Sequence, residues 1–159
     1  MAAEKPYTNY IRYVPGRQNM LRISRVHTWL YRSTNGRIGA RLDGLDILLL
    51  QTTGRRSQKP RTTPMPYFVF DTCYIMVASN GNLHSNPAWL FNLESAPLAS
   101  VQIGADKFSV EATRVEAAER EVIWRRVVTK QPRYVEYQNK TRRLIPLVRL
   151  RRVDLGEAP

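Results

Sequence analysis

A short, strongly cationic segment between two apolar runs constrains the fold of this chain more than any other feature. Residues 52–64 contain four cations, six hydroxyl or amide side chains and no acid. The apolar run 47–50 precedes this segment and the apolar run 67–70 follows it. Short apolar runs bounded by turn residues are typical of buried strands, so the order predicts strand, cationic turn and strand. Such a turn is suited to bind a fixed anion, since Arg and Lys supply charge-assisted donors and Gly54 lets the backbone approach closely.

The bulk composition predicts one globular domain. The chain has 159 residues, enough to close a single hydrophobic core, which we expect over residues 17–155. Residues 1–16 contain two Pro and one Gly, and we expect them to be loosely ordered. The sequence has no apolar run of about 18 residues, so we expect neither a membrane-spanning helix nor an export signal. Cys73 is a single cysteine, so the expected location is the cytoplasm.

The net charge of +12 predicts an anionic partner. Residues 5–42 carry eight Arg or Lys and no acid, and residues 140–152 carry six more. The partner classes that this charge favours are nucleic acid, an acidic membrane surface and an acidic small molecule.

Short strands dominate the predicted elements. We expect strands at 46–52, 62–70, 73–79, 98–103, 107–114 and 147–155. Asp71 and Thr72 form a plausible two-residue hairpin turn, and the prolines at 64 and 66 place the second strand at an edge or a bulge. Many short antiparallel strands with few helices indicate a mainly β (α+β) fold built on a small barrel.

The expected helices cover residues 17–32, 87–94 and 115–130, with a further helical turn at 134–139. In the first helix one face is apolar, and its members are Met20, Ile23, Val26, His27, Leu30 and Tyr31. The opposite face carries Arg22, Arg25 and Arg32, joined by Trp29. We expect Asn86 to cap the second helix, with Pro87 at its first position. The apolar residues expected from the third helix are Val115, Val122, Trp124, Val127 and Val128.

The common catalytic motifs are absent from the sequence. It has no Gly-rich dinucleotide fingerprint and no Walker-type Gly-Lys-Ser/Thr. One Cys and two His cannot form a zinc site at a familiar spacing, so no metal site is expected. If the chain is an enzyme, a bound organic cofactor must carry the difficult chemistry.

Three blocks, in this order and at these intervals, resemble the deazaflavin-dependent nitroreductase family, whose members are also described as quinone reductases that use coenzyme F420. The first block is residues 52–64. The second joins residues 78–81 to Asn86, Pro87, Ala88, Trp89, Asn92 and Leu93. The third is residues 132–138, followed by Thr141, Arg143, Ile145 and Pro146. The resemblance spans roughly residues 17–150.

The resemblance implies an FMN-binding-like split β-barrel with a basic N-terminal helix. It also implies an oxidoreductase that transfers a hydride from reduced coenzyme F420 to a quinone-like, nitroaromatic or other electron-poor acceptor. The implied catalytic residues are Tyr134 and Tyr137, which would face the substrate. The implied cofactor-binding residues are Arg55, Arg56, Ser57, Lys59, Arg61, Thr62, Thr63, Pro64, Met65, Ala78, Ser79, Asn80, Gly81, Asn86 and Trp89. Among these, the cations of the turn would hold the phosphate and acidic tail, and Trp89 would wall the ring.

Several alternatives stay open at the level of sequence. The chain is also compatible with a basic nucleic-acid-binding module or with a carrier that holds F420 without turnover. The helix at 17–32 either packs on the barrel or rests on an anionic membrane at the inner membrane face. Split barrels often dimerise, so a homodimer is a further expected partner. Gln58 and Gln131 depart from the family, which usually has Gly at the first position and, in members that reduce nitro drugs, an aromatic residue at the second.

Overall fold

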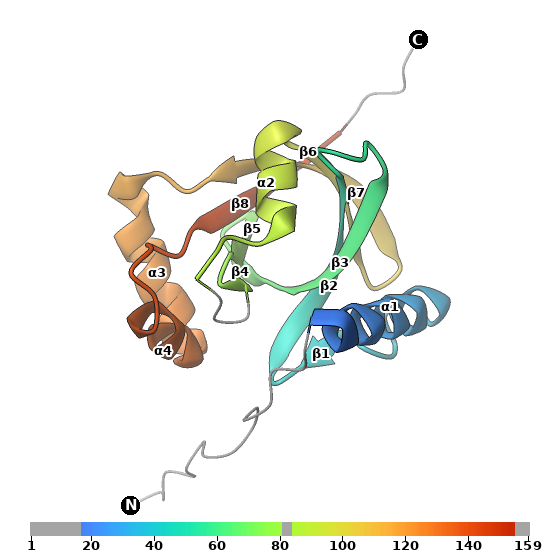
Figure 1. Ribbon diagram of the computed structural model, residues 1–159, viewed down its shortest axis with the longest axis horizontal. Helices are drawn as coiled ribbons and strands as arrows, with labels where there is room; N and C mark the ends of the chain where they lie inside the picture. Colours follow the sequence, from blue (N-terminus) through green and yellow to red (C-terminus); the bar gives the residue numbers. More distant parts are fainter. Residues whose placement is uncertain (1–16, 81–83, 155–159) are drawn as a thin grey trace, which may run out of the picture.

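A computed structural model describes residues 17–80 and 84–154, and the expectation for residues 1–16 lies outside them. These residues form a curled antiparallel sheet with helices packed on it (Figure 1). The strands are β1 (Arg41–Leu42), β2 (Leu45–Thr53), β3 (Pro60–Pro66), β4 (Phe68–Phe70), β5 (Cys73–Val77), β6 (Leu98–Ile103), β7 (Asp106–Arg114) and β8 (Leu147–Val153). The helices are α1 (Arg17–Ser33), α2 (Ala88–Ser95), α3 (Ala117–Lys130) and α4 (Arg133–Asn139).

The strand order is β1-β2-β6-β7-β8-β5-β4, and β3 pairs with β2 outside this path. The predicted antiparallel barrel is therefore confirmed, and it is open rather than closed. The expected strand 62–70 is two strands, because residues up to Pro66 pair with β2 whereas Phe68–Phe70 pair with β5. Between them the backbone N–H of Tyr67 donates to the carbonyl of Asp46 at 3.1 Å.

Alternation along β2 builds two of the three hydrophobic clusters. Leu48 and Leu50 face the barrel interior, where Trp89, Leu90 and Leu93 of α2 join them. Ile47 and Leu49 face the outside and pack against Tyr31 of α1. The third cluster lies between the sheet and α3 and α4. Each fully buried Leu or Ile contributes roughly 1.5–3 kcal/mol to folding, so this period-2 pattern fixes which face of β2 points inward.

The face by which α1 packs agrees with the expected one in part, at His27 and Tyr31 but not at Ile23 and Val26. Tyr31 is completely buried, and its hydroxyl donates to the carbonyl of Ile47 at 2.9 Å while accepting from the backbone N–H of Gly104 at 2.9 Å. A ring nitrogen of His27 lies 2.7 Å from the carbonyl of Gly39. Ile23 and Val26, expected at the interface, are each 58% exposed. Hydrogen bonds from two aromatic residues thus set the rotation of the helix; the side chain of Met20 lies outside the description.

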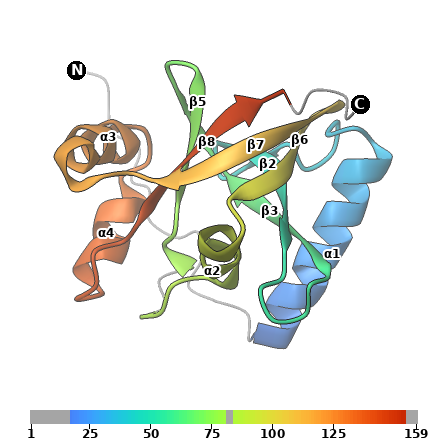
Figure 2. The ribbon, with the colours of Figure 1, turned by 90° about the horizontal axis from the view of Figure 1, so that it is seen from above.

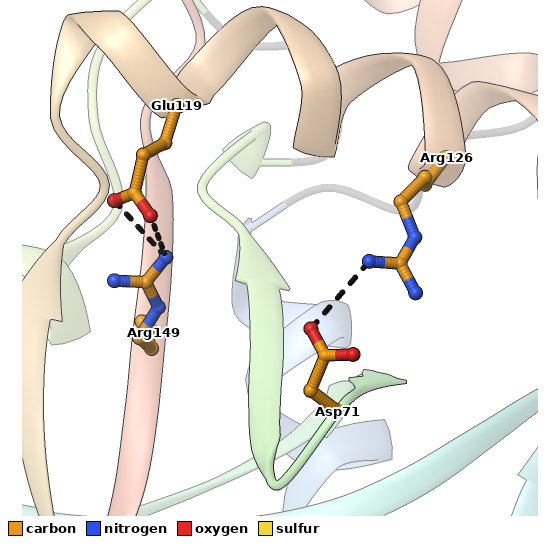
Figure 3. A network of polar contacts seen from close by, with 4 residues as sticks. All are labelled: Asp71, Glu119, Arg126 and Arg149. Carbon is orange, nitrogen blue, oxygen red and sulfur yellow. Dashed lines mark hydrogen bonds and ion pairs between the residues drawn. The ribbon is translucent and has the colours of Figure 1, made fainter.

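Helices α3 and α4 lie on the side of the barrel opposite α1 (Figure 2). A guanidinium nitrogen of Arg149 on β8 lies 3.2 Å from both carboxylate oxygens of Glu119 on α3 (Figure 3). The same helix reaches the β4–β5 turn through Arg126, 3.7 Å from Asp71. These exposed pairs add little to stability. In α3 the expected core residue Val122 is 58% exposed, and Ile123 is buried in its place.

Among the described residues no helix combines the length and the apolar character that crossing a bilayer requires.

Candidate functional site

The cationic loop between β2 and β3 is a closed turn. The backbone N–H of Gly54 donates to the carbonyl of Lys59 at 2.9 Å, and that of Gln58 donates to the carbonyl of Gly54 at 2.7 Å. Gln58 has φ +53°, in the region that favours glycine. Its side-chain amide donates to the carbonyl of Arg55 at 3.0 Å, which compensates part of the backbone strain. Gln58 thus adopts the left-handed conformation at the position where the resemblance implies a glycine.

The positive charge of this loop is not neutralised. The guanidinium of Arg61 donates to the hydroxyl of Ser57 at 3.2 Å, and the guanidinium of Arg55 lies over the ring of Phe91, 4.6 Å from its centroid. Arg56 and Lys59 are also exposed. In the part of the chain that the structure describes, none of these four cations forms an ion pair. The loop can therefore attract and hold a multiply charged anion.

A buried amide on α2 anchors the base of the loop. Asn92 is 7% exposed, and its side-chain oxygen accepts from the backbone N–H of Arg55 at 3.1 Å. Its side-chain NH₂ donates to the hydroxyl of Thr52, itself 3% exposed, at 3.0 Å. Asn92 is not among the site residues expected from the sequence, although a single amide within the apolar run of α2 was a signal for such a role.

The second edge of β3 has backbone groups available to a ligand, because β3 pairs with β2 alone among the described strands. The prolines of β3 stand at even-numbered positions, 60, 64 and 66, and have no N–H to donate to β2. The even-numbered residues of β3 therefore direct their backbone groups away from β2. Thr62 shares the parity, and its N–H is therefore the one donor on this edge between Pro60 and Pro66.

The side chains of the predicted β3 residues do not share a face. Strand pairing places Thr62 opposite Gln51 and Pro64 opposite Leu49, on the outer side near α1. Thr63 and Met65 lie on the inner side, opposite Leu50 and Leu48 respectively. Of these four residues, Thr62 and Pro64 direct their backbone groups to the unpaired edge, whereas Thr63 and Met65 direct theirs toward β2.

The end of β5 is held by Arg143, a residue to which the sequence assigned no role. Its guanidinium donates to the carbonyl of Ala78 at 3.2 Å and to that of Ser79 at 3.0 Å. It also donates to the side-chain oxygen of Asn86 at 2.8 Å. This contact explains why the predicted capping role of Asn86 is wrong: the N-cap of α2 is Pro87, without a side-chain cap bond. Arg143 thus brings three predicted site residues together.

The two halves of the site meet along α2. The cationic loop contacts the helix at Asn92, and Arg143 contacts the chain just before the helix at Asn86. Figure 2 shows the β2–β3 loop and α2 on the same side of the molecule. Trp89 projects into the barrel interior, 6% exposed, and packs in the core cluster.

Asn80 follows the β5 exit in a left-handed conformation, with φ +55°. Its side-chain NH₂ donates to the carbonyl of Ser85 at 3.0 Å, so it bridges the two sides of the loop before α2. Gly81, also a predicted site residue, lies outside the described residues.

The two predicted catalytic tyrosines lie on α4. The ring of Tyr134 packs edge-on against Phe68, at 6.1 Å between centroids, and against Tyr137, at 5.9 Å. Tyr134 is 6% exposed, and this burial raises the pKa of its hydroxyl far above the ordinary value, so it stays protonated. Tyr137 is half-buried. The helix joins the rest of the site through Gln138, whose NH₂ donates to the carbonyl of Arg143 at 2.8 Å.

In the second basic stretch, which was a candidate for nucleic-acid binding, three of the six cations form ion pairs with described residues. Arg149, Arg151 and Arg152 lie 3.2, 2.8 and 3.1 Å from carboxylates on α3 and β7. These pairs reduce the positive charge that a phosphate backbone would need. Within residues 17–80 and 84–154, no group of three or more His, Cys, Asp or Glu side chains is placed to hold a metal ion.

The family model described as F420H(2)-dependent quinone reductase matches residues 23–152 of the chain. An F420H(2)-dependent quinone reductase of Mycobacterium tuberculosis is 38% identical over 136 residues, or 83% of this chain and 91% of the relative. A solved F420-H2 dependent reductase, FDR-A, is 40% identical with a TM-score of 0.60, over 65% of this chain and 92% of that one. Another solved structure, described as a domain-swapped dimer, is 36% identical with a TM-score of 0.63, over 84% of this chain and 98% of that one.

Proposed function

The chain belongs to the F420H(2)-dependent quinone reductase family, and on that premise we propose that it reduces a quinone-like acceptor with reduced coenzyme F420. The observation that carries the proposal is the exposed loop, whose four cations form no ion pair with any described residue, anchored on α2 beside an edge of β3 that pairs with no other described strand. A coenzyme with a phosphate and an acidic tail requires such a receptor. When bound, the reduced coenzyme supplies a hydride to the acceptor.

We assign the residues of the chain to holding, positioning and proton donation. Arg55, Arg56, Lys59 and Arg61 bind the anionic groups of the coenzyme, with Ser57 orienting Arg61. The backbone edge of β3 at residues 62–65 and the β5 exit at residues 78–80 border the ring. Arg143 holds the β5 exit in place. Asn86 has its side-chain oxygen occupied by Arg143, so its role is positioning.

The tyrosines of α4 serve the acceptor. A quinone that receives a hydride develops negative charge on oxygen, and a protonated hydroxyl stabilises that charge or donates a proton to it. We assign this donation to Tyr137, which is half-buried, and the orientation of Tyr137 to the buried ring of Tyr134 packed against it.

A reoxidation assay tests this function. Purified protein is mixed with reduced coenzyme, and its reoxidation is followed against quinones, nitroimidazoles and enones. We expect turnover with quinones, loss of affinity for the coenzyme in Arg55→Ala/Arg61→Ala, and little change in the charge-matched control Arg25→Ala/Arg37→Ala. A preference for FMN over the coenzyme would refute the cofactor assignment. Tight binding without turnover on any acceptor would instead identify a carrier.

The same assay measures which classes of acceptor the protein reduces. Nitroaromatic compounds belong to the panel because the acceptor side of the site lies on α4, next to Gln131. Gln131 is the C-cap of α3, and an aromatic residue is expected there in members that reduce nitro drugs. We therefore expect turnover of nitroimidazoles to be slower than that of quinones.

We also propose that α1 rests reversibly on an anionic membrane surface. Its outward face exposes Ile23, Val26 and Trp29, the last at 66%, among the cations Arg22 and Arg25. Apolar and basic residues together on one exposed helix face are typical of interfacial binding. Trp29 is a natural reporter: its fluorescence should shift to the blue with anionic vesicles and not with neutral ones, and no shift with either would exclude this contact.

Two further features of the assembly belong to the proposal. Residues 17–155 form one domain, which is supported by three clusters built on a single sheet. A homodimer is supported by the 36%-identical relative described as a domain-swapped dimer. Sedimentation at several concentrations would show a monomer if this second point is wrong.

A further inference from the structure

A polar pocket of about 220 Å³ lies on the outer face of the barrel, away from the barrel interior and α2. It is bordered by the C-terminal end of α1 and by strands β2, β3, β6 and β7. Its polar lining consists of two cations, two amides and two hydroxyls, and no acid: Arg32, Lys107, Gln51, Gln102, Thr62 and Ser100. Leu49 adds an apolar contact.

The strand register brings these side chains together. Gln51 lies opposite Thr62 on β3 and opposite Ser100 on β6, and paired residues of antiparallel strands point to the same face. One step along the sheet, Gln102 lies opposite Leu49 on β2 and opposite Lys107 on β7. Leu49 packs outward against α1, so the whole set faces outward as well.

Hydrogen bonds to neutral groups hold the pocket without reducing its charge. One guanidinium nitrogen of Arg32 donates to the side-chain oxygen of Gln51 at 3.1 Å and to the hydroxyl of Thr62 at 2.9 Å. Gln102 is 5% exposed, and its NH₂ donates to the carbonyl of Gly104 at 2.9 Å.

The two cations keep their charge available. Neither Arg32 nor Lys107 takes part in an ion pair within the described part of the chain. Asp106, the acid next to Lys107 in sequence, lies 3.1 Å from Arg152 instead. Two positive charges with hydroxyl and amide donors around them form a receptor for an oxyanion.

We propose that this pocket binds a small oxyanion, of the phosphate or carboxylate class, between Arg32 and Lys107. Its volume of about 220 Å³ is smaller than that of a usual cofactor pocket, which is roughly 300–1,000 Å³. The side chain of Thr62 points to this face, whereas the cationic loop lies beyond the end of the β2–β3 hairpin. The bound anion links α1 to β7 and so strengthens the docking of the helix. The proposal is independent of the proposed function, because it requires no coenzyme.

The side-chain amides of Gln51 and Gln102 report on the pocket directly. Protein labelled with ¹⁵N is titrated with phosphate, and separately with acetate, to about 50 mM at constant ionic strength set with chloride. We expect saturable shifts of both amide signals with a dissociation constant on the order of 1 mM, since exposed charge pairs bind weakly. Absence of saturable shifts with both anions, or the same shifts with chloride alone, would overturn the proposal.

Charge-neutral variants complete the test. Arg32→Gln and Lys107→Gln should each weaken phosphate binding by about tenfold, since each removes one of two cations. Arg25→Gln, on the exposed face of the same helix, should leave it unchanged. The side chain of Lys107 makes no hydrogen bond or ion pair with the described residues, so its variant stays informative if Arg32→Gln disturbs α1. Loss of the shifts in Arg55→Ala/Arg61→Ala, or unchanged affinity in Lys107→Gln, would show that phosphate binds at another site and would refute the proposal.

Discussion

Replacing Asn92 by Leu tests whether the cationic loop is fixed through α2. The two side chains are similar in size, so the substitution removes hydrogen bonds rather than volume. It deprives the backbone N–H of Arg55 of its acceptor at 3.1 Å and the hydroxyl of Thr52 of its donor at 3.0 Å. Thr52 is only 3% exposed, so water cannot easily replace the lost donor.

The size of the effect follows from these contacts. Each hydrogen bond contributes about 1 kcal/mol net, and a buried group left without a partner costs about 1–3 kcal/mol. We therefore expect Asn92→Leu to lower the free energy of unfolding by about 2–4 kcal/mol. Urea unfolding of the protein without coenzyme measures this loss, and an unchanged m-value would show that the unfolded state is unaffected.

A double-mutant cycle isolates the contact between the two side chains. Thr52→Val keeps the volume and removes the hydroxyl, so it should cost less in the Asn92→Leu background than in the original protein. We expect the double variant to be more stable than additivity predicts by about 1 kcal/mol. Additive losses, or a loss below about 0.5 kcal/mol for Asn92→Leu alone, would refute the reasoning. Coenzyme affinity should fall along with stability, because Arg55 loses its anchor.

Three further predictions concern the same region and its surroundings. A Cβ on Gly54 would lie 2.6 Å from the Ser57 hydroxyl oxygen, so Gly54→Ala should cost about 1–3 kcal/mol in urea unfolding, and adding Ser57→Ala should recover part of it. Arg143→Gln removes at least the three hydrogen bonds to Ala78, Ser79 and Asn86 and should cost about 2–4 kcal/mol in thermal or urea unfolding, whereas the exposed neighbour Arg142→Gln should stay within about 0.5 kcal/mol; equal effects would deny Arg143 its structural role. Burial, and then the charge of Asp46, raises the pKa of Tyr67 from 10.0 to about 12, so this residue contributes stability that is fully present below pH 10 and is lost as the pH rises toward 12. Tyr67→Phe should show a shallower alkaline loss in unfolding measurements, and an identical pH profile would contradict the assignment.

Local patterns predicted the elements of the sheet well, because alternation and turn residues are local properties. The hairpin expected at 98–103 and 107–114 is β6 and β7, which end and begin at Ile103 and Asp106. The cationic turn also lies between β2 and β3, as predicted from the run of Arg and Lys that follows the apolar strand. The tight turn at Asp71 forms without Gly, with φ +56° at that residue.

The errors come from contacts between residues distant in sequence. Asn86 fits the pattern of a helix cap, but its oxygen bonds to Arg143, 57 residues away. On the predicted face of α1, Tyr31 and His27 do contact the barrel through hydrogen bonds, but Ile23 and Val26, placed there by hydrophobicity, are exposed. The role of Asn92 depends in the same way on a backbone group 37 residues away. The pattern of residues within a single helix or strand cannot show which distant residue each of these side chains contacts.

The prolines of β3 have a consequence for how the molecule behaves at high concentration. An uncovered edge of a sheet normally acts as a template on which a neighbouring chain can add a strand and begin a fibre. With Pro at 60, 64 and 66, this edge denies an incoming strand most of the N–H groups that it would need. The edge of β3 can therefore stay open to a small ligand without promoting polymerisation of the protein through that edge.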